Sequence, residues 1–239
     1  MKHYKASAEL KSLAKGQLMD HYSLAIGAVL ILGLIRMFMG FSFNFFIDYT
    51  TVLGTILYYG IDLILAVILG VFTVGELFLF LKISCGQKGA LSDIFYGFNM
   101  HPDKIIKMQF FIVIISTLFL VPYDICNYFY NSTGNALFFL LSSIAGVIGG
   151  AAFVLFRLSL SQCFYLLLDF PDHSAKELMQ QSIRVMKGNK GRLFYLYISF
   201  IPLMFLGFMT CGIAFLWLIP YIRSTMTNFF LDLMHNQDV

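Results

Sequence analysis

Charged residues are scarce in this sequence, and their scarcity excludes an ordinary soluble domain. Only 12% of the 239 residues are Asp, Glu, Lys or Arg, whereas 59% are hydrophobic. Charged residues make up about 25% of a typical soluble protein, so most of this chain is expected to lie in a lipid bilayer. The formal net charge of +3 is also too small for the electrostatic footprint of a nucleic-acid-binding protein, and we expect no nucleic-acid partner.

Residue arrangements typical of catalysis and of metal binding are missing as well. The four cysteines show neither CxxC spacing nor a ligand pairing with histidine, which argues against a metal site. The sequence contains no HExxH or GxSxG motif of the kind found in hydrolases, and its five histidines have no paired carboxylates beside them. We therefore predict a protein that is not an enzyme and that uses no cofactor and no metal.

Long apolar runs alternate with segments that carry lysine or arginine. Most of these runs reach or exceed the ~20 residues that cross a bilayer as a helix, and we expect six spans. The first four cover residues 22–41, 52–82, 105–121 and 136–168, and a polar external loop is expected over residues 127–135. The last two form a hairpin within residues 182–221, with a turn at Thr210, Cys211 and Gly212 between the two apolar runs. With six crossings the clustered lysines and arginines all fall on one side, so the positive-inside rule places both termini in the cytoplasm.

The predicted fold class is all-α, a polytopic integral membrane bundle of six spans. Basic amphipathic segments near residues 1–21, 91–98 and 174–186 precede the three pairs of spans, so we expect three hairpins that each follow an amphipathic cytoplasmic helix. In the third of these helices, Ser174 is followed three residues later by Glu177, which predicts a capping box. The chain is expected to be a single membrane domain, 1–239, with degenerate repeats at 1–83, 84–169 and 170–239.

A family resemblance is concentrated in the last quarter of the chain. The residues that carry it surround the final hairpin: Ser182, Met186 to Lys190, Arg192, Phe194, Ser199 to Ile201, Thr210, Gly212, Ile213, Trp217, Pro220, Tyr221 and Phe229 to Leu233. They resemble a bacterial integral membrane family known as domain of unknown function 975, which is itself similar to the membrane domain attached to some glycerophosphodiester phosphodiesterases. The resemblance implies a multi-span protein of the bacterial cell membrane. It implies no reaction, because the family has none assigned and no metal-binding catalytic barrel is present in this sequence.

Five charged residues lie inside the predicted spans or at their boundary: Arg36, Asp62, Glu76, Arg157 and Arg223. Ionisable groups in a bilayer are costly and are therefore candidates for function. Judged by depth, Arg36 and Asp62 belong to the outer half of the bundle, whereas Glu76 and Arg157 belong to the inner half. These residues either form two interhelical ion pairs that fix helix register, or line a polar path for a solute, a proton or a lipid headgroup.

A basic, glycine-containing segment precedes the last hairpin and consists of Lys187, Gly188, Asn189, Lys190 and Arg192. Cations beside a flexible backbone suit an anion such as a lipid headgroup. The alternative is that these charges only orient the chain in the membrane.

Small residues recur every four positions in the fourth span, at Ser142, Gly146 and Gly150. This spacing lets another helix approach the backbone closely. It favours packing within the bundle, with homodimerisation as the alternative.

The overlong second and fourth runs, the interfacial helices and the basic segment together favour a non-enzymatic membrane protein. We expect it to bind or organise lipid, another amphipathic molecule or a partner protein at the cytoplasmic leaflet. Membrane lipid is the expected partner, and a homo-oligomer or a second membrane protein stays open. The alternative function is a small transporter, exporter or permease subunit that uses the intramembrane charges.

Overall fold

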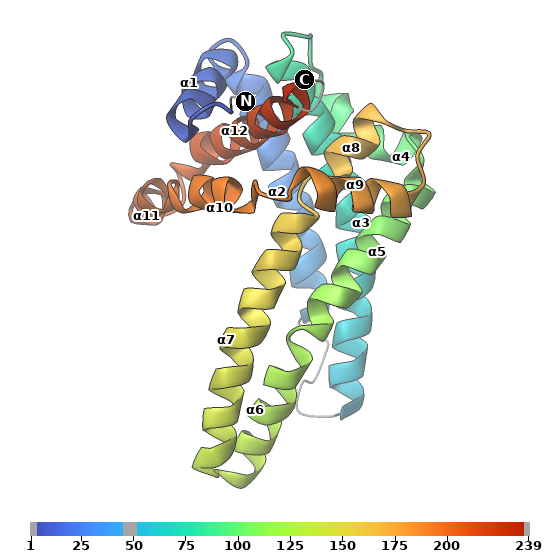
Figure 1. The fold of residues 1–239 in the computed structure, drawn as a ribbon, viewed down its shortest axis with the longest axis vertical. Coiled ribbons are helices and arrows are strands. Elements are labelled where there is room, and N and C mark those ends of the chain that lie inside the picture. Colours follow the sequence, from blue (N-terminus) through green and yellow to red (C-terminus); the bar gives the residue numbers. More distant parts are fainter. Residues whose placement is uncertain (1–3, 45–51, 237–239) are drawn as a thin grey trace.

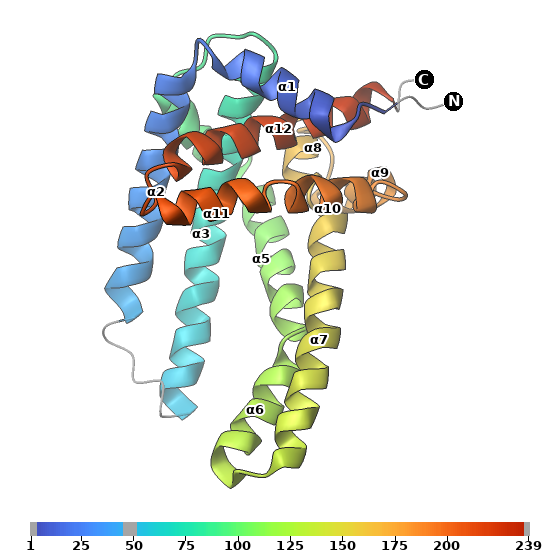
Figure 2. The same cartoon turned by 90° about the vertical axis from the view of Figure 1, so that its left-hand side faces the viewer.

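The computed structural model describes residues 4–44 and 52–236, and within these ranges the chain is helical apart from turns and short connections. Its helices form two groups (Figures 1 and 2): long rods that run side by side, which we call the stem, and the remaining helices, which lie around and across one end of the rods and which we call the cap. The stem comprises α2 (Tyr22–Asn44), α3 (Val52–Ser84), α5 (Pro102–Leu118), α6 (Val121–Thr133) and α7 (Ala136–Ser159). The cap comprises α1 (Ser7–Leu18), the 3-10 helix η1 (Leu91–Phe95), α4 (Tyr96–Asn99), α8 (Cys163–Asp169), α9 (Ala175–Val185), α10 (Lys190–Ile198), α11 (Ile201–Met209) and α12 (Phe215–His235).

Several helices are long and apolar enough to cross a membrane, which indicates a membrane protein. Among the described residues there are four such segments: Tyr22–Gly40, Ile56–Ser84, Ala136–Asp169 and Lys190–Met209. The pair α5 and α6, bent by 43° at its break, makes a fifth if it is taken as one span. The six predicted spans are not confirmed. The helix α12 is not among the candidates, and beside apolar residues it buries five polar ones: Ser224, Thr225, Thr227, Asn228 and Asp232.

The last predicted hairpin has an orientation that the sequence did not indicate. The helices α10 and α11 continue from α9 across the stem, and α12 returns along the same direction in the cap (Figures 1 and 2). The turn predicted between the two apolar runs is confirmed, and Cys211 and Gly212 adopt φ values of 50° and 91° there. The final pair of helices therefore lies across the stem instead of running along it.

The segment after the third predicted span is also different from expectation. The predicted polar loop over residues 127–135 is mostly helical, because α6 runs from Val121 to Thr133. Pro122 lies in its first turn, where a missing N–H breaks no helical hydrogen bond. Gly134, at φ 64°, ends α6, and the side chain of Asn135 caps α7 by accepting a hydrogen bond from the Leu137 N–H at 2.9 Å.

The small residues of α7 face α5 and α6, but not all at the predicted positions. Ser142 is buried, and a Cβ on Gly146 would lie 3.2 Å from the ring of Tyr123. A Cβ on Gly149 would overlap the backbone at the end of α5, whereas one on Gly150 would meet open space. The contact ridge therefore follows Ser142, Gly146 and Gly149, which supports packing within the bundle.

Two of the three predicted amphipathic segments form regular α-helices of the cap, α1 and α9. The helix α1 buries Leu10, Ala14 and Leu18 and packs mainly on α12. The capping box of α9 is confirmed: the Ser174 N–H donates to Glu177 Oε2 at 2.8 Å, and the Glu177 N–H donates to Ser174 Oγ at 3.3 Å.

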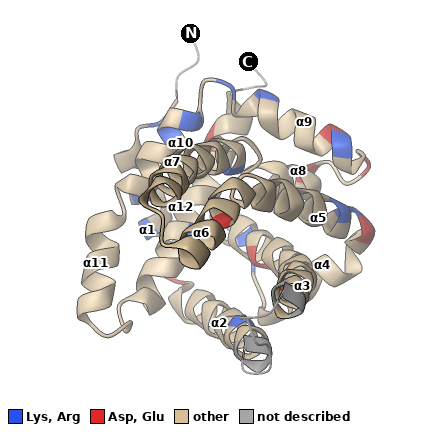
Figure 3. Cartoon of the chain, turned by 90° about the horizontal axis from the view of Figure 1, so that it is seen from below, with Lys and Arg blue, Asp and Glu red and all other residues tan. Residues whose placement is uncertain are grey.

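Charge is concentrated at one end of the spans. Viewed from the free end of the stem, α6 and α7 are almost free of charged residues (Figure 3), and residues 121–156 contain no lysine or arginine. Most lysines and arginines lie on the cap or at the cap ends of the rods. This asymmetry agrees with a cap on the cytoplasmic side of a membrane.

Candidate functional site

Glu76 is the centre of an ion-pair cluster that joins three helices. Its side chain, on α3, is 1% exposed. Its Oε2 accepts a hydrogen bond from Arg36 Nη2 of α2 at 3.0 Å, and its Oε1 accepts one from Arg223 Nε of α12 at 2.8 Å. A buried carboxylate is tolerated only with partners of this kind. This Glu76 cluster ties the stem to the cap.

The predicted pairing of Arg36 with Asp62 and of Glu76 with Arg157 is wrong. The prediction treats the last helix as a span, whereas α12 crosses the stem and brings Arg223 against α3. A long arginine side chain also reaches well away from its own backbone, which lets Arg36 contact Glu76. Asp62 and Arg157 are both exposed, and neither has an ion-pair partner among the residues that the structure describes.

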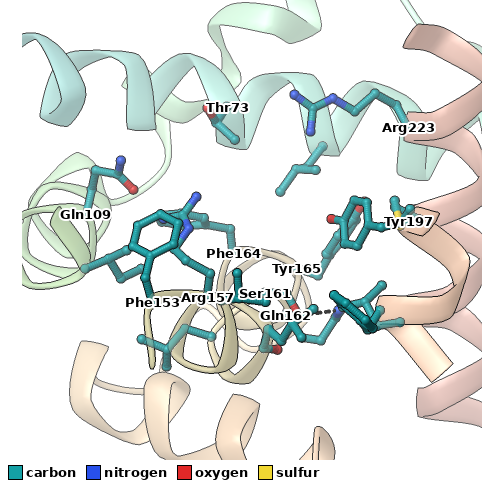
Figure 4. A pocket seen from close by; sticks show the side chains of 18 residues that line it. Thr73, Gln109, Phe153, Arg157, Ser161, Gln162, Phe164, Tyr165, Tyr197 and Arg223 are labelled. Atoms are coloured by element: carbon teal, nitrogen blue, oxygen red, sulfur yellow. Dashed lines mark hydrogen bonds between the residues drawn. The ribbon is translucent and has the colours of Figure 1, made fainter. Parts of the chain in front are cut away.

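A cavity of about 570 Å³ lies beside the Glu76 cluster, where α3, α5, α7, α8, α10 and α12 meet. Arg157 of α7 and Arg223 of α12 extend into it from different helices (Figure 4), and no aspartate or glutamate occurs among its described lining residues. Tyr197 of α10 lines the same space (Figure 4). The wall therefore carries positive charge without a carboxylate of its own. We call this space the arginine cavity.

The depth of the arginine cavity is apolar, and its rim is exposed. Four buried apolar residues form part of the inner wall: Leu77, Ile112, Leu158 and Met226. The exposed lining residues come from α7 and α10: Val154, Arg157, Phe194 and Tyr197. The exposed part of the lining is therefore formed by one rod of the stem, α7, and by one helix of the cap, α10.

Polar side chains in the wall mostly have hydrogen-bond partners within the protein. The Tyr165 hydroxyl lies 3.0 Å from Thr227 Oγ1, and Gln109 Nε2 donates to a backbone carbonyl of α3 at 3.2 Å. Gln162 is 3% exposed and donates through Nε2 to Ser161 Oγ at 2.9 Å. Its Oε1 is buried and accepts no hydrogen bond from any part of the described chain. An unpaired buried acceptor is uncommon, so Gln162 is a further candidate for ligand contact.

The basic segment before α10 divides into two parts. Arg192 donates to Asp232 Oδ2 at 2.8 Å and to the Lys5 carbonyl at 3.0 Å, and it stacks over the ring of Tyr4. Asn189 is buried and donates to a backbone carbonyl of α9. These two residues therefore hold the N-terminal segment on the cap.

Three residues of the segment are left for contact with an anion. Lys187 is exposed, Gly188 adopts φ 85° next to it, and Lys190 is half-buried. They lie at the surface of the cap and do not line the arginine cavity.

Sequence reasoning named both arginines of the cavity but did not bring them together. It missed Gln109, Gln162 and Tyr197, which also line the cavity. One signal was present, because the adjacent polar residues Ser161 and Gln162 interrupt the apolar run that continues from α7 into α8.

A family model for proteins of unknown function, DUF975, matches residues 1–237. The chain belongs to the DUF975 family. Searches of curated proteins and of solved structures each found no match. Membership confirms the family resemblance read from the last quarter of the sequence and extends it to almost the whole chain. The arginine cavity and the Glu76 cluster both lie within the matched residues.

Proposed function

We propose that this DUF975 member is a non-enzymatic multi-span protein of the cell membrane that holds a lipid or a related amphipathic molecule at the cytoplasmic leaflet. The supporting observation is the pair of guanidinium groups, from Arg157 and Arg223, in a cavity whose described lining residues include no carboxylate. Arginine is well suited to phosphate and carboxylate groups because its planar fork donates several hydrogen bonds at once. The apolar inner wall suits the hydrophobic part of the same molecule.

The proposed orientation places the cap and both termini in the cytoplasm, since lysine and arginine concentrate at that end. The helices α10 and α11 then lie along the cytoplasmic leaflet. Phe205 and Phe208 of α11 are exposed, and so is Trp217 of α12. These aromatic side chains suit the boundary between acyl chains and headgroups. The exposed lining residues of the arginine cavity lie on α7 and α10, which gives a lipid at this level a lateral route into the cavity. Similarity to phosphodiesterase membrane domains and a bacterial origin stay hypotheses that this proposal does not use.

A transporter is the alternative reading of the intramembrane charges. Both carboxylate oxygens of Glu76 accept hydrogen bonds from arginines, which leaves no free carboxylate in the cluster to carry a proton or a cation. This geometry supports a structural ion pair for Glu76. Arg157, in contrast, has no ion-pair or hydrogen-bond partner in the described parts of the chain, and its guanidinium is therefore available to a headgroup.

Binding of anionic lipid to the purified protein, measured by native mass spectrometry, tests the proposal. Removing one hydrogen bond to a charged group costs about 1.5–3 kcal/mol, so Arg157→Gln is expected to weaken binding about 10–100-fold. Arg184→Gln removes an exposed cation of α9 that does not line the cavity and serves as the matched control. Its surface interaction of about 1 kcal/mol or less corresponds to an effect of at most about fivefold. Equal effects of the two substitutions, or none from Arg157→Gln, would move the site out of the cavity.

A further inference from the structure

We infer that the arginine cavity selects a phosphate monoester, which carries two negative charges, over a singly charged phosphodiester. This inference rests on the proposed function and specifies the chemical class of its ligand. It depends on the local balance of charge, on the hydrogen-bonding capacity of the two arginines and on the shape of the cavity.

The charge balance in and beside the cavity is positive by two. Arg157 and Arg223 belong to the wall, and no carboxylate does among the described lining residues. The adjacent Glu76 is shared between Arg223 and Arg36, so its single negative charge is matched by the positive charge of Arg36. A phosphate monoester carries about −1.5 to −2 at pH 7 and therefore neutralises both remaining charges. A phosphodiester carries one charge and leaves a cation uncompensated in a partly desolvated wall.

Hydrogen-bond donors remain available on both arginines. Arg223 donates to Glu76 through Nε, and no hydrogen bond of its two Nη groups is found within residues 4–44 and 52–236. Arg157 donates no hydrogen bond to any residue in those ranges. A guanidinium has five N–H donors, so together the two side chains offer more donors than a phosphodiester's two free oxygens can use well. The three terminal oxygens of a monoester are better matched to two forks.

The dimensions of the cavity suit a headgroup with its chains outside. A volume of about 570 Å³ lies within the range of small-molecule sites, about 300–1,000 Å³. The exposed apolar residues of its rim, Val154 and Phe194, continue into the outer surfaces of α7 and α10.

The same phosphate monoester group occurs in lipids and in soluble phosphate esters, so the experiment must distinguish these two ligands. The full chain in detergent micelles should therefore be titrated with dioleoyl phosphatidic acid, dioleoyl phosphatidylglycerol and dioleoyl phosphatidylcholine, with bound lipid counted by native mass spectrometry. Glycerol 3-phosphate and inorganic phosphate are added as competitors. We expect phosphatidic acid to bind at least tenfold more tightly than phosphatidylglycerol, and millimolar glycerol 3-phosphate not to displace it.

The variants separate this inference from the proposed function. Arg157→Gln should lower phosphatidic acid binding to the level of phosphatidylglycerol, whereas Arg184→Gln, an exposed arginine outside the cavity, should leave the ratio of the two affinities unchanged. Arg157→Gln is expected to fold, because the side chain is exposed and has no ion pair in the described chain, and its melting temperature verifies this. If glycerol 3-phosphate displaces phosphatidic acid with equal affinity, the ligand is still a phosphate monoester, but a soluble one and not a lipid. Equal binding of the two anionic lipids, sensitive to Arg157→Gln, would overturn the selectivity and leave the proposed function standing. If neither phosphatidic acid nor phosphatidylglycerol binds more tightly than phosphatidylcholine, both the selectivity and the proposed function are overturned.

Discussion

Substitution of Glu76 by glutamine tests how the cap is held on the stem. The change keeps the shape of the side chain and removes the negative charge that pairs with Arg36 and Arg223. Loss of one partner of a buried ion pair costs about 3–5 kcal/mol. We expect the lower end, about 3 kcal/mol, because the two arginine side chains are 37% and 32% exposed and recover part of their hydration.

The expected loss is measurable as a change in melting temperature. For proteins of about 150–250 residues, 1 kcal/mol corresponds to about 2–4 °C, so Glu76→Gln should lower the melting temperature in detergent or nanodiscs by about 6–12 °C. The chain offers a matched control on the same helix. Asp62 is exposed and has no ion-pair partner in the described residues, so Asp62→Asn should change stability by less than about 0.5 kcal/mol.

A double substitution distinguishes an ion pair from a general need for glutamate. Arg223→Gln alone should also destabilise the protein, because it leaves Glu76 with one partner, and the Glu76→Gln, Arg223→Gln double variant should be more stable than the sum of the single effects predicts. The reasoning is refuted if Glu76→Gln melts within about 2 °C of the wild type. The carboxylate would then be dispensable for folding, and transport through the bundle would become the leading explanation of the intramembrane charges.

Two further predictions concern the helix contact of α7 and the cap of α9. Gly149→Ala should reduce the yield of folded protein in size-exclusion chromatography, because its Cβ would overlap the backbone of the neighbouring rod. Gly150→Ala should be neutral or slightly stabilising, because its Cβ meets open space. Equal yields of the two variants would contradict the contact ridge of α7. Hydrogen bonds from the Ser174 N–H and hydroxyl lower the pKa of Glu177 below its ordinary 4.5, so its stabilising effect is complete above that value and is lost as the pH falls through the lower pKa of the folded state. Glu177→Gln should therefore flatten the acid side of the melting-temperature profile, and an unchanged profile would contradict this assignment.

Local features of the fold could be predicted from the sequence because they depend on neighbouring residues. The capping box at Ser174 and Glu177 needs only a spacing of three residues and a following helix. The turn at Cys211 and Gly212 is flanked by two apolar runs and has a glycine at a positive φ. Each of these signals is complete within a few positions, and each is present in the structure.

The direction of a helix could not be predicted in the same way. Hydropathy measures how apolar a segment is, and the segment Lys190–Met209 passes that test although it lies across the stem. The depth of a charged residue was judged from its place in a presumed span, so Arg223 was assigned no partner on α3. The continuation of α12 beyond the predicted sixth span, to His235, buries polar residues such as Ser224 and Asp232, and their burial depends on the helices packed against them, which the sequence does not show.

Arg223 belongs both to the Glu76 cluster and to the wall of the arginine cavity. It therefore connects the two interpretations of the intramembrane charges, a structural ion pair and a contact with a ligand. Glu76 holds Arg223 through Nε, which fixes the plane of the guanidinium and leaves its Nη groups for the cavity. A structural ion pair thus preorganises a binding group, and preorganisation lowers the entropic cost of binding. Substitutions at Glu76 should therefore weaken both folding and phosphate binding. Substitution of Arg157, which contacts no carboxylate in the described chain, should weaken binding alone.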